Sequence, residues 1–203
     1  MPATIRLAIE DDAAAIREIY APHCEQTIVS FEEVAPSTGE MASRVRRISE
    51  RFPWLVLDED DVVAGYAYAS PHAERAAYRW SADAAVYVNA AFHRRGAGTA
   101  LYATLFDLLR QQGFFKIYAA ISLPNPASTA LHESVGFRLV GIYEGVGYKF
   151  GAWHDVAHYQ MPLQPERENP EPPLPISSLI GTNGGSDAVA LGLQQYASGG
   201  RRS

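Results

Sequence analysis

The feature that most constrains this chain is a glycine-containing turn within Trp80–Ala100. It lies between an apolar, strand-like run at Ala84–Val88 and a helical segment, and it reads Arg94-Arg95-Gly96-Ala97-Gly98. The first turn of a helix leaves backbone N–H groups unpaired and carries a partial positive charge, so it attracts anions. Glycines allow the main chain to approach an anion closely, and arginines add donors that suit phosphate. The sequence therefore predicts a strand, a phosphate-binding turn and a helix in succession.

Two other phosphate-binding loops do not fit this turn. A Walker-type loop requires Lys followed by Ser or Thr after its last glycine, whereas Gly98 is followed by Thr99 and Ala100. A dinucleotide-binding fingerprint requires a third glycine, and Leu101 stands in its place. For the loop taken alone, an ordinary strand-to-helix turn without a ligand is the alternative interpretation.

Length and composition favour one folded domain. The chain has 203 residues and a net charge of -6, which argues against a general nucleic-acid binder because most of that affinity comes from phosphate neutralisation. Its single cysteine, Cys24, excludes an intrachain disulfide and suits a reducing compartment. Neither a signal peptide nor a membrane-spanning run is evident. We therefore expect a cytoplasmic protein with no nucleic-acid or membrane partner.

The composition changes after Leu163. Residues 164–175 are rich in Pro and Glu, and Gly, Ser and Ala dominate from Ser177 onward. Such segments bury too little apolar surface to fold by themselves. We expect a domain over residues 1–163 and a disordered tail over residues 164–203, within which Ala188–Tyr196 could form a short helix.

Apolar periodicity and turn residues predict a mixed α/β fold in which helices cover both faces of one sheet. A capping box at Ser37–Glu40 opens one helix, whose arginines are interpreted as a solvated face, and Pro22 is expected to bend or end another. The expected strands are 4–9, 54–58, 62–69, 84–88, 114–121, 138–143 and 153–161, and the expected helices follow Asp11 or Asp12, Ser37, Gly96 and Asn125.

The loop and the order of elements resemble the GNAT superfamily of acetyl-CoA-dependent N-acetyltransferases. Their pyrophosphate loop reads Gln/Arg-x-x-Gly-x-Gly/Ala, and His93 departs from it at the first position. Other segments are similar to phosphinothricin N-acetyltransferases and to the methionine sulfoximine and sulfone acetyltransferases. They are Phe52-Pro53-Trp54, Ala64–Ala69, Arg75…Tyr78…Trp80, Val86–Val88, Gly113-Phe114, Leu123-Pro124-Asn125, Gly136-Phe137, His132-Glu133 and Trp153–Val156.

The resemblance implies a GNAT fold over residues 3–163, with acetyl-CoA as co-substrate. The strand Val86–Val88 would bind the pantetheine arm through its main chain, and one N–H near Tyr87 would polarise the thioester carbonyl. The loop Arg94–Thr99 would hold the pyrophosphate, and Asn125 and Ser128 would bind pantetheine. The implied cofactor-binding residues are Val86, Tyr87, Val88, Arg94, Arg95, Gly96, Ala97, Gly98, Thr99, Asn125 and Ser128.

The resemblance also implies two catalytic residues. Asp83 occupies the position of the general base, normally a glutamate; because aspartate is one methylene shorter, a relaying water is expected. His132 would hold or protonate the thiolate, or take part in a proton relay. Without the resemblance, Asp83 would be interpreted as an exposed residue before a strand and His132 as a surface histidine on a helix. Phe31, Arg75 and Tyr78 would shape the acceptor pocket, while Ala73 stands where some members have lysine.

The activity implied is acetyl transfer to the α-amine of a small amino-acid-like acceptor, such as phosphinothricin, methionine sulfoximine or methionine sulfone. The amine would attack acetyl-CoA directly in a ternary complex. The resemblance also implies a homodimer. Two alternatives are another amine, such as a polyamine or a protein N-terminus, and a non-catalytic acyl-CoA sensor. We expect no metal site, because His154 and His158 on one strand would lie about 13 Å apart. Cys24 has no evident partner for nucleophilic catalysis.

Overall fold

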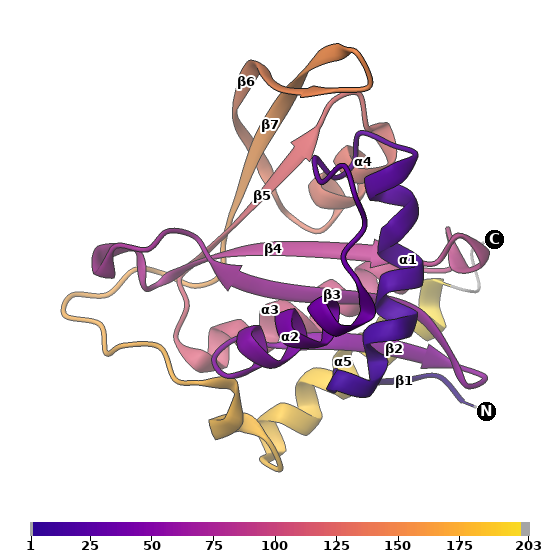
Figure 1. Cartoon of the computed structure of the whole chain (residues 1–203). Coiled ribbons are helices and arrows are strands. Elements are labelled where there is room, and N and C mark those ends of the chain that lie inside the picture. The colour runs from indigo at the N-terminus through magenta and orange to yellow at the C-terminus, as the bar shows by residue number, and fades with distance from the viewer. Residues whose placement is uncertain (1, 200–203) are drawn as a thin grey trace.

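A computed structural model describes residues 2–199, which build a seven-stranded sheet with the strand order β1-β2-β3-β4-β5-β7-β6 (Figure 1). Neighbouring strands are antiparallel except for the parallel pair β4 and β5. The strands are β1 (Thr4–Leu7), β2 (Trp54–Glu59), β3 (Val62–Pro71), β4 (Ser81–Val88), β5 (Lys116–Ser122), β6 (Arg138–Lys149) and β7 (Ala152–Pro162).

Helices cover both faces of the sheet, so the predicted mixed α/β architecture is confirmed (Figure 1). The Ser37 hydroxyl accepts a hydrogen bond from the Glu40 N–H at the start of α2, and the left-handed Gly113 ends α3, as predicted. Helix α1 continues three residues past Pro22. The α-helices are α1 (Ala13–Glu25), α2 (Thr38–Ser49), α3 (Ala97–Gln112), α4 (Pro126–Ser134) and α5 (Asn183–Gly199), and the 3₁₀ helices are η1 (Glu10–Asp12), η2 (Ala76–Tyr78), η3 (Ala90–Phe92) and η4 (Ile176–Leu179).

The alternation of side chains along each strand creates two cores. In β2, Leu55 and Leu57 face the core beneath α3, whereas Trp54 and Val56 face the core beneath α1 and α2. Helix α3 buries a leucine stripe that includes Leu105 against the sheet. Each such side chain contributes about 1.5–3 kcal/mol, so this helix and the loop that precedes it are firmly placed.

The sheet opens between β4 and β5. Their parallel register covers Ser81–Asp83 and Lys116–Tyr118, after which the two strands diverge (Figure 1). Strand β5 continues along β7, and β4 continues along β3. On its β5 side the rest of β4 has no strand partner among residues 2–199, which leaves main-chain groups there to bind a ligand, apart from the Val88 carbonyl, which lies 3.1 Å from His93 Nε2.

The segment that follows Leu163 differs from the expected disordered tail. Residues 183–199 form α5, which packs along α3 with Ala188, Gly192 and Tyr196 buried. A Cβ on Gly192 would lie 2.0 Å from the Thr104 hydroxyl, so only glycine permits this approach. The buried face consists largely of small residues, which is why the pattern of large apolar residues did not reveal it. The expected helix at 188–196 lies inside α5; residues 200–203 lie outside the described part of the chain, and the boundary at residue 163 stays a prediction.

Within residues 2–199, none of the helices has the length and apolar character needed to cross a membrane.

Candidate active site

A groove of about 590 Å³ lies between the end of β4, the first turn of α3 and the first turn of α4. Ten of the eleven predicted cofactor-binding residues line it together, although they come from three separate segments of the chain. They are Val86, Tyr87, Val88, Arg94, Gly96, Ala97, Gly98, Thr99, Asn125 and Ser128.

The two loop glycines have different roles. Gly96 has a φ of +86°, which favours glycine, and it begins α3 without any side-chain cap. The first N–H groups of α3 are therefore left to bind an anion in the groove. Gly98 is buried, and a Cβ there would lie 2.9 Å from the Leu131 side chain. The second glycine thus allows α3 to pack against α4, a role that the loop pattern alone did not show.

The structure places Arg95 outside the groove. Its guanidinium donates to Glu59 Oε1 at 2.7 Å and lies over the Phe92 ring, 4.9 Å from the centroid. Arg94 has a φ of +60° and lines the groove. Consecutive side chains of this turn therefore point in different directions, so Arg95 supports the loop where phosphate contact was expected.

Asp83 forms a pair with a histidine that the sequence analysis missed. Asp83 Oδ1 lies 2.7 Å from His72 Nδ1, and the His72 ring stacks on Tyr118 at 4.1 Å with its edge toward Tyr78 at 6.0 Å. Burial raises the pKa of the Asp83 carboxyl, and the hydrogen bond with His72 opposes that rise. A carboxyl with a raised pKa accepts a proton more readily, which suits a general base.

His72 follows β3 and lies eleven residues before Asp83 in the sequence. The antiparallel register of β3 and β4 places Ser70 opposite Asp83 and thereby brings His72 back to it. The available signal was a histidine at the end of a predicted strand whose partner strand carries the candidate base.

His132 is buried, with 5% of its surface exposed. Its Nδ1 lies 2.8 Å from the Ser128 carbonyl, and its Nε2 lies 2.8 Å from the Tyr102 hydroxyl. Burial lowers its pKa, so the neutral ring can donate to the carbonyl and accept from the tyrosine. His132 does not line the groove; it reaches it through Ser128, whose hydroxyl lies 3.3 Å from Nδ1.

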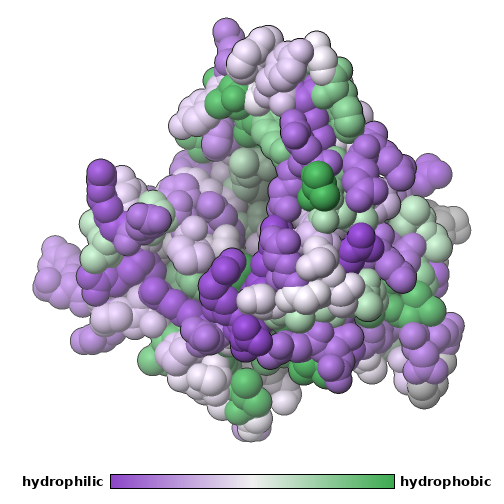
Figure 2. All heavy atoms as spheres, viewed as in Figure 1, coloured by the Kyte–Doolittle hydropathy of each residue, from purple (hydrophilic) through white to green (hydrophobic). Residues whose placement is uncertain are grey.

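A second cavity, of about 380 Å³, lies between α2 and the sheet on the face that carries Asp83. Ser70 lines this cavity and stands opposite Asp83 in the register, so both side chains point to the same side of the sheet. Figure 2 shows this face of the molecule hollowed near its centre. The cavity is lined by Tyr20, Glu40, Met41, Ser43, Arg44, Arg47, Ile48, Trp54, Tyr66, Tyr68 and Ser70.

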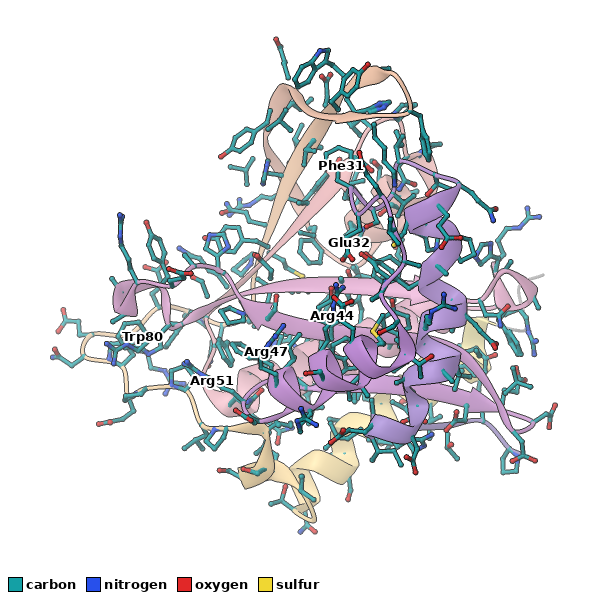
Figure 3. All side chains as sticks on the ribbon, viewed as in Figure 1. Phe31, Glu32, Arg44, Arg47, Arg51 and Trp80 are labelled. Atoms are coloured by element: carbon teal, nitrogen blue, oxygen red, sulfur yellow. The ribbon has the colours of Figure 1, made fainter. Side chains whose placement is uncertain are left out.

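Arg44 and Arg47 bring positive charge to this cavity (Figure 3). Glu32 holds Arg44 by two hydrogen bonds of 2.7 and 3.0 Å, and Glu40 adds a third of 2.7 Å. Arg47 is exposed at the cavity wall. The interpretation of the arginines at 44, 46, 47 and 51 as a solvated face agrees with the exposure of the last three and is wrong for Arg44, which is half-buried and held by Glu32 and Glu40. The path of the sheet beneath α2 is not visible in the helix sequence.

The expected acceptor-pocket residues separate into two places. Tyr78 joins the His72 cluster, and Arg75 is exposed at the start of η2. Phe31 instead packs against the β6–β7 hairpin, where its ring leaves no room for a Cβ on Gly147 and lies 6.3 Å from His154. The structure thus brings Tyr78, but not Phe31, into contact with the group around Asp83.

Lys149 fixes the segment that carries Phe31. Its side chain is 3% exposed, and its ammonium donates to the carbonyls of four residues at 2.5–2.9 Å. The acceptors are Cys24 in the last turn of α1 and Thr27, Ser30 and Glu32 in the segment that follows it. One cation therefore ties β6 to the segment whose Glu32 holds Arg44 at the second cavity.

Comparisons with known proteins agree with this arrangement. Residues 5–157 match the acetyltransferase (GNAT) domain family. A phosphinothricin N-acetyltransferase of Streptomyces viridochromogenes is 38% identical over 86% of this chain and 93% of its own length. An L-methionine sulfoximine/L-methionine sulfone acetyltransferase of Salmonella typhimurium is 34% identical over 79% of this chain and 94% of its own.

A solved structure shows the same fold. It is a GNAT superfamily phosphinothricin acetyltransferase from Sinorhizobium meliloti in complex with AcCoA, 35% identical, with a TM-score of 0.78 over 87% of this chain and 99% of that one. The chain therefore belongs to the GNAT superfamily of acetyltransferases.

Proposed function

We propose that this chain is a cytoplasmic acetyltransferase that moves an acetyl group from acetyl-CoA to the α-amine of a small amino-acid-like acceptor. The acceptor class is that of phosphinothricin, methionine sulfoximine and methionine sulfone, which the relatives' names describe. The observation that carries the proposal is the adjacency of two features on one strand. The end of β4 lines the groove beside the uncapped α3, and the same strand carries the Asp83–His72 pair.

The groove fits the parts of acetyl-CoA in order. The first N–H groups of α3 and the side chain of Arg94 would bind the diphosphate. The free main chain of β4 would pair with the amide groups of pantetheine as a neighbouring strand does, and Asn125 and Ser128 would bind the same arm. The N–H near Tyr87 would polarise the thioester carbonyl, because a donor at that oxygen stabilises the negative charge that develops there.

Asp83 removes a proton from the acceptor ammonium, directly or through a water. The amine nitrogen then forms a bond to the acetyl carbon while the carbon–sulfur bond breaks, and CoA leaves as a thiolate. His72 positions the carboxylate by its hydrogen bond, and the His72 ring is itself held in place by stacking on Tyr118. Because the amine attacks the thioester directly, no acyl-enzyme forms.

The Ser128 hydroxyl would donate a hydrogen bond to the departing thiolate, which then takes its proton from solvent water in the groove. Ser128 lines the groove, and its hydroxyl lies 3.3 Å from His132 Nδ1, while His132 Nε2 accepts from the Tyr102 hydroxyl. We therefore assign His132 to holding the thiolate indirectly, by orienting Ser128 from behind the groove. Direct contact between its ring and the sulfur does not fit its burial.

The cavity beneath α2 is the candidate acceptor pocket. Its arginines suit a carboxylate or a phosphinate, which guanidinium groups bind by paired hydrogen bonds, and its aromatic wall suits an aliphatic stem. Arg44 is already paired with Glu32 and Glu40, so Arg47 is the guanidinium that would bind the acidic group of the acceptor.

We also propose a homodimer. The β6–β7 hairpin projects from the body of the molecule (Figure 1) and exposes large apolar side chains. Its five most exposed are Val140 (58%), Tyr143 (59%), Tyr148 (59%), Phe150 (60%) and Trp153 (68%). An apolar surface of this kind is typical of a subunit interface. Sedimentation equilibrium tests it, and a monomer at micromolar concentration would contradict it.

The function is tested by measuring the release of free CoA thiol with phosphinothricin, methionine sulfoximine, methionine sulfone, the ordinary amino acids and spermidine. We expect turnover with the first three and little with spermidine. Turnover confined to spermidine or a peptide N-terminus would show that the acceptor is another amine. Tight binding of acetyl-CoA without turnover of any acceptor would favour the acyl-CoA sensor.

A further inference from the structure

Helix α5 contacts the phosphate-binding loop although it lies outside the segment that matches the family, residues 5–157. Gly199, its last residue, lies against Gly96, the residue that begins α3. A Cβ on Gly199 would lie 2.9 Å from Gly96 Cα, and one on Gly96 would lie 3.2 Å from Gly199 Cα. Gly199 also lines the groove. The end of α5 and the beginning of α3 are thus fitted to each other at the candidate diphosphate site.

A chain of hydrogen bonds joins the two helices at the same point. The Tyr196 hydroxyl donates to Glu59 Oε2 at 2.7 Å, and Arg95 donates to Glu59 Oε1 at 2.7 Å. Tyr196 is buried against α3, and burial together with Glu59 raises its pKa to about 12, so its hydroxyl remains a donor near neutral pH. Both oxygens of Glu59 are therefore occupied, one by α5 and one by the loop.

Arg95 stands between the two loop residues with left-handed backbones. Arg94 and Gly96 have φ values of +60° and +86°, and both line the groove, whereas Arg95 points away from it. A non-glycine residue in the left-handed region is strained, and it persists only where its surroundings hold it. We call the two hydrogen bonds on Glu59, one from Tyr196 and one from Arg95, the Glu59 clasp. Because the clasp fixes Arg95, it holds this turn in its binding shape.

We propose that α5 positions the phosphate-binding loop for acetyl-CoA, with Tyr196 as a positioning residue that acts through Glu59 and Arg95. The inference rests on the proposed acetyl-CoA site. Its physical basis is preorganisation, because a loop already held in its bound shape loses less conformational freedom when the cofactor binds. Tyr196 itself does not line the groove, so its effect on the cofactor is indirect.

The test is Tyr196→Phe in the full chain, with Glu59→Gln as a second variant. We expect the Kd and KM for acetyl-CoA to rise about three- to tenfold for Tyr196→Phe, the effect of one net hydrogen bond, and further for Glu59→Gln. The kcat at saturating acetyl-CoA and the KM for the acceptor should stay within about twofold, because the groups around Asp83 are untouched.

Two controls separate this mechanism from others. Gln194→Ala changes an exposed residue of α5 and should leave all constants unchanged. Deletion of residues 200–203 removes Arg201 and Arg202 but keeps α5, and it should reproduce little of the loss. The inference is overturned if both clasp variants bind acetyl-CoA like the wild type, or if the deletion alone reproduces the loss. If the wild type itself shows no heat with acetyl-CoA in calorimetry, the proposed function fails first.

Discussion

Replacement of Lys149 by methionine is the sharpest test of how the acceptor wall is held. The ammonium donates to four backbone carbonyls in the segment 24–32, of which the bonds to Cys24 and Ser30 are fully buried. Methionine keeps the length and volume of the stem but donates nothing. Water can replace the donor at the two partly buried carbonyls, whereas the two buried ones would be left unpaired.

The magnitude follows from those two carbonyls. Each buried acceptor without a partner costs about 1–3 kcal/mol, which gives about 2–6 kcal/mol for the pair. Removal of the buried charge offsets part of this cost, because an ammonium is expensive to bury. We therefore expect the free energy of unfolding to fall by about 2–4 kcal/mol and the segment 24–32 to exchange its amide hydrogens faster.

Urea unfolding and hydrogen exchange measure these two effects. Lys116→Met is the matched control, since Lys116 is partly exposed and pairs with Glu166 at the surface, so its loss should change the unfolding free energy by less than about 0.5 kcal/mol. Because Glu32 holds Arg44 in the candidate acceptor pocket, the KM for the acceptor should also rise in Lys149→Met. An unfolding free energy and an exchange pattern equal to those of the wild type would refute the reasoning.

Three further outcomes can be measured. Asp83→Asn should lower kcat by about 10²–10⁴ while acetyl-CoA still binds. In the wild type, kcat/KM should decrease as the pH is lowered, because Asp83 becomes protonated at its raised pKa. The same decrease at low pH in the variant would point to another base. His72→Phe removes the hydrogen bond that opposes this rise, so the acid limb should move to higher pH in a pH–rate profile; an unmoved limb would contradict a positioning role. Because burial lowers the pKa of His132, the unfolded chain binds a proton more readily than the native chain. Stability should therefore be full above the ordinary histidine pKa and decline as the pH falls through that value toward the lowered one. Urea unfolding at pH values of about 7.5 and 5 should show a smaller decline for His132→Gln, with part of it left by the half-buried His23, whose pKa is also lowered by burial.

The phosphate-binding loop was predictable because its information is local. Helix start, glycine positions and the preceding strand all lie within Trp80–Ala100, and the structure gathers Val86–Val88 and Gly96–Thr99 around one groove. The element order was predictable for a similar reason, since strands and helices follow from periodicity along the chain. Asp83 and His132 were selected by resemblance, and their roles stay predictions.

The contacts that could not be predicted join residues far apart in the sequence. Arg95 meets Glu59 across 36 residues, and Tyr196 meets Glu59 across 137. The direction of Arg95 depends on the left-handed residues on either side of it, which the one-letter pattern does not specify. The full length of α5 and its packing on α3 were missed, although a short helix at 188–196 was expected, because its buried face is made by Ala188, Gly192 and Tyr196, whose fit depends on the shape of α3.

The packing of α5 has a practical consequence for anyone who shortens this protein. A fragment cut at residue 163, just after β7, would keep the sheet but lose Tyr196 and Ile176, which are part of the main core, and would uncover the outer side of α3. The surface of α3 exposed to solvent in this way would be apolar and continuous, and such surfaces favour aggregation. Recombinant versions trimmed to the domain borders of relatives should therefore precipitate or lose yield, whereas those that keep the full terminus should remain dispersed.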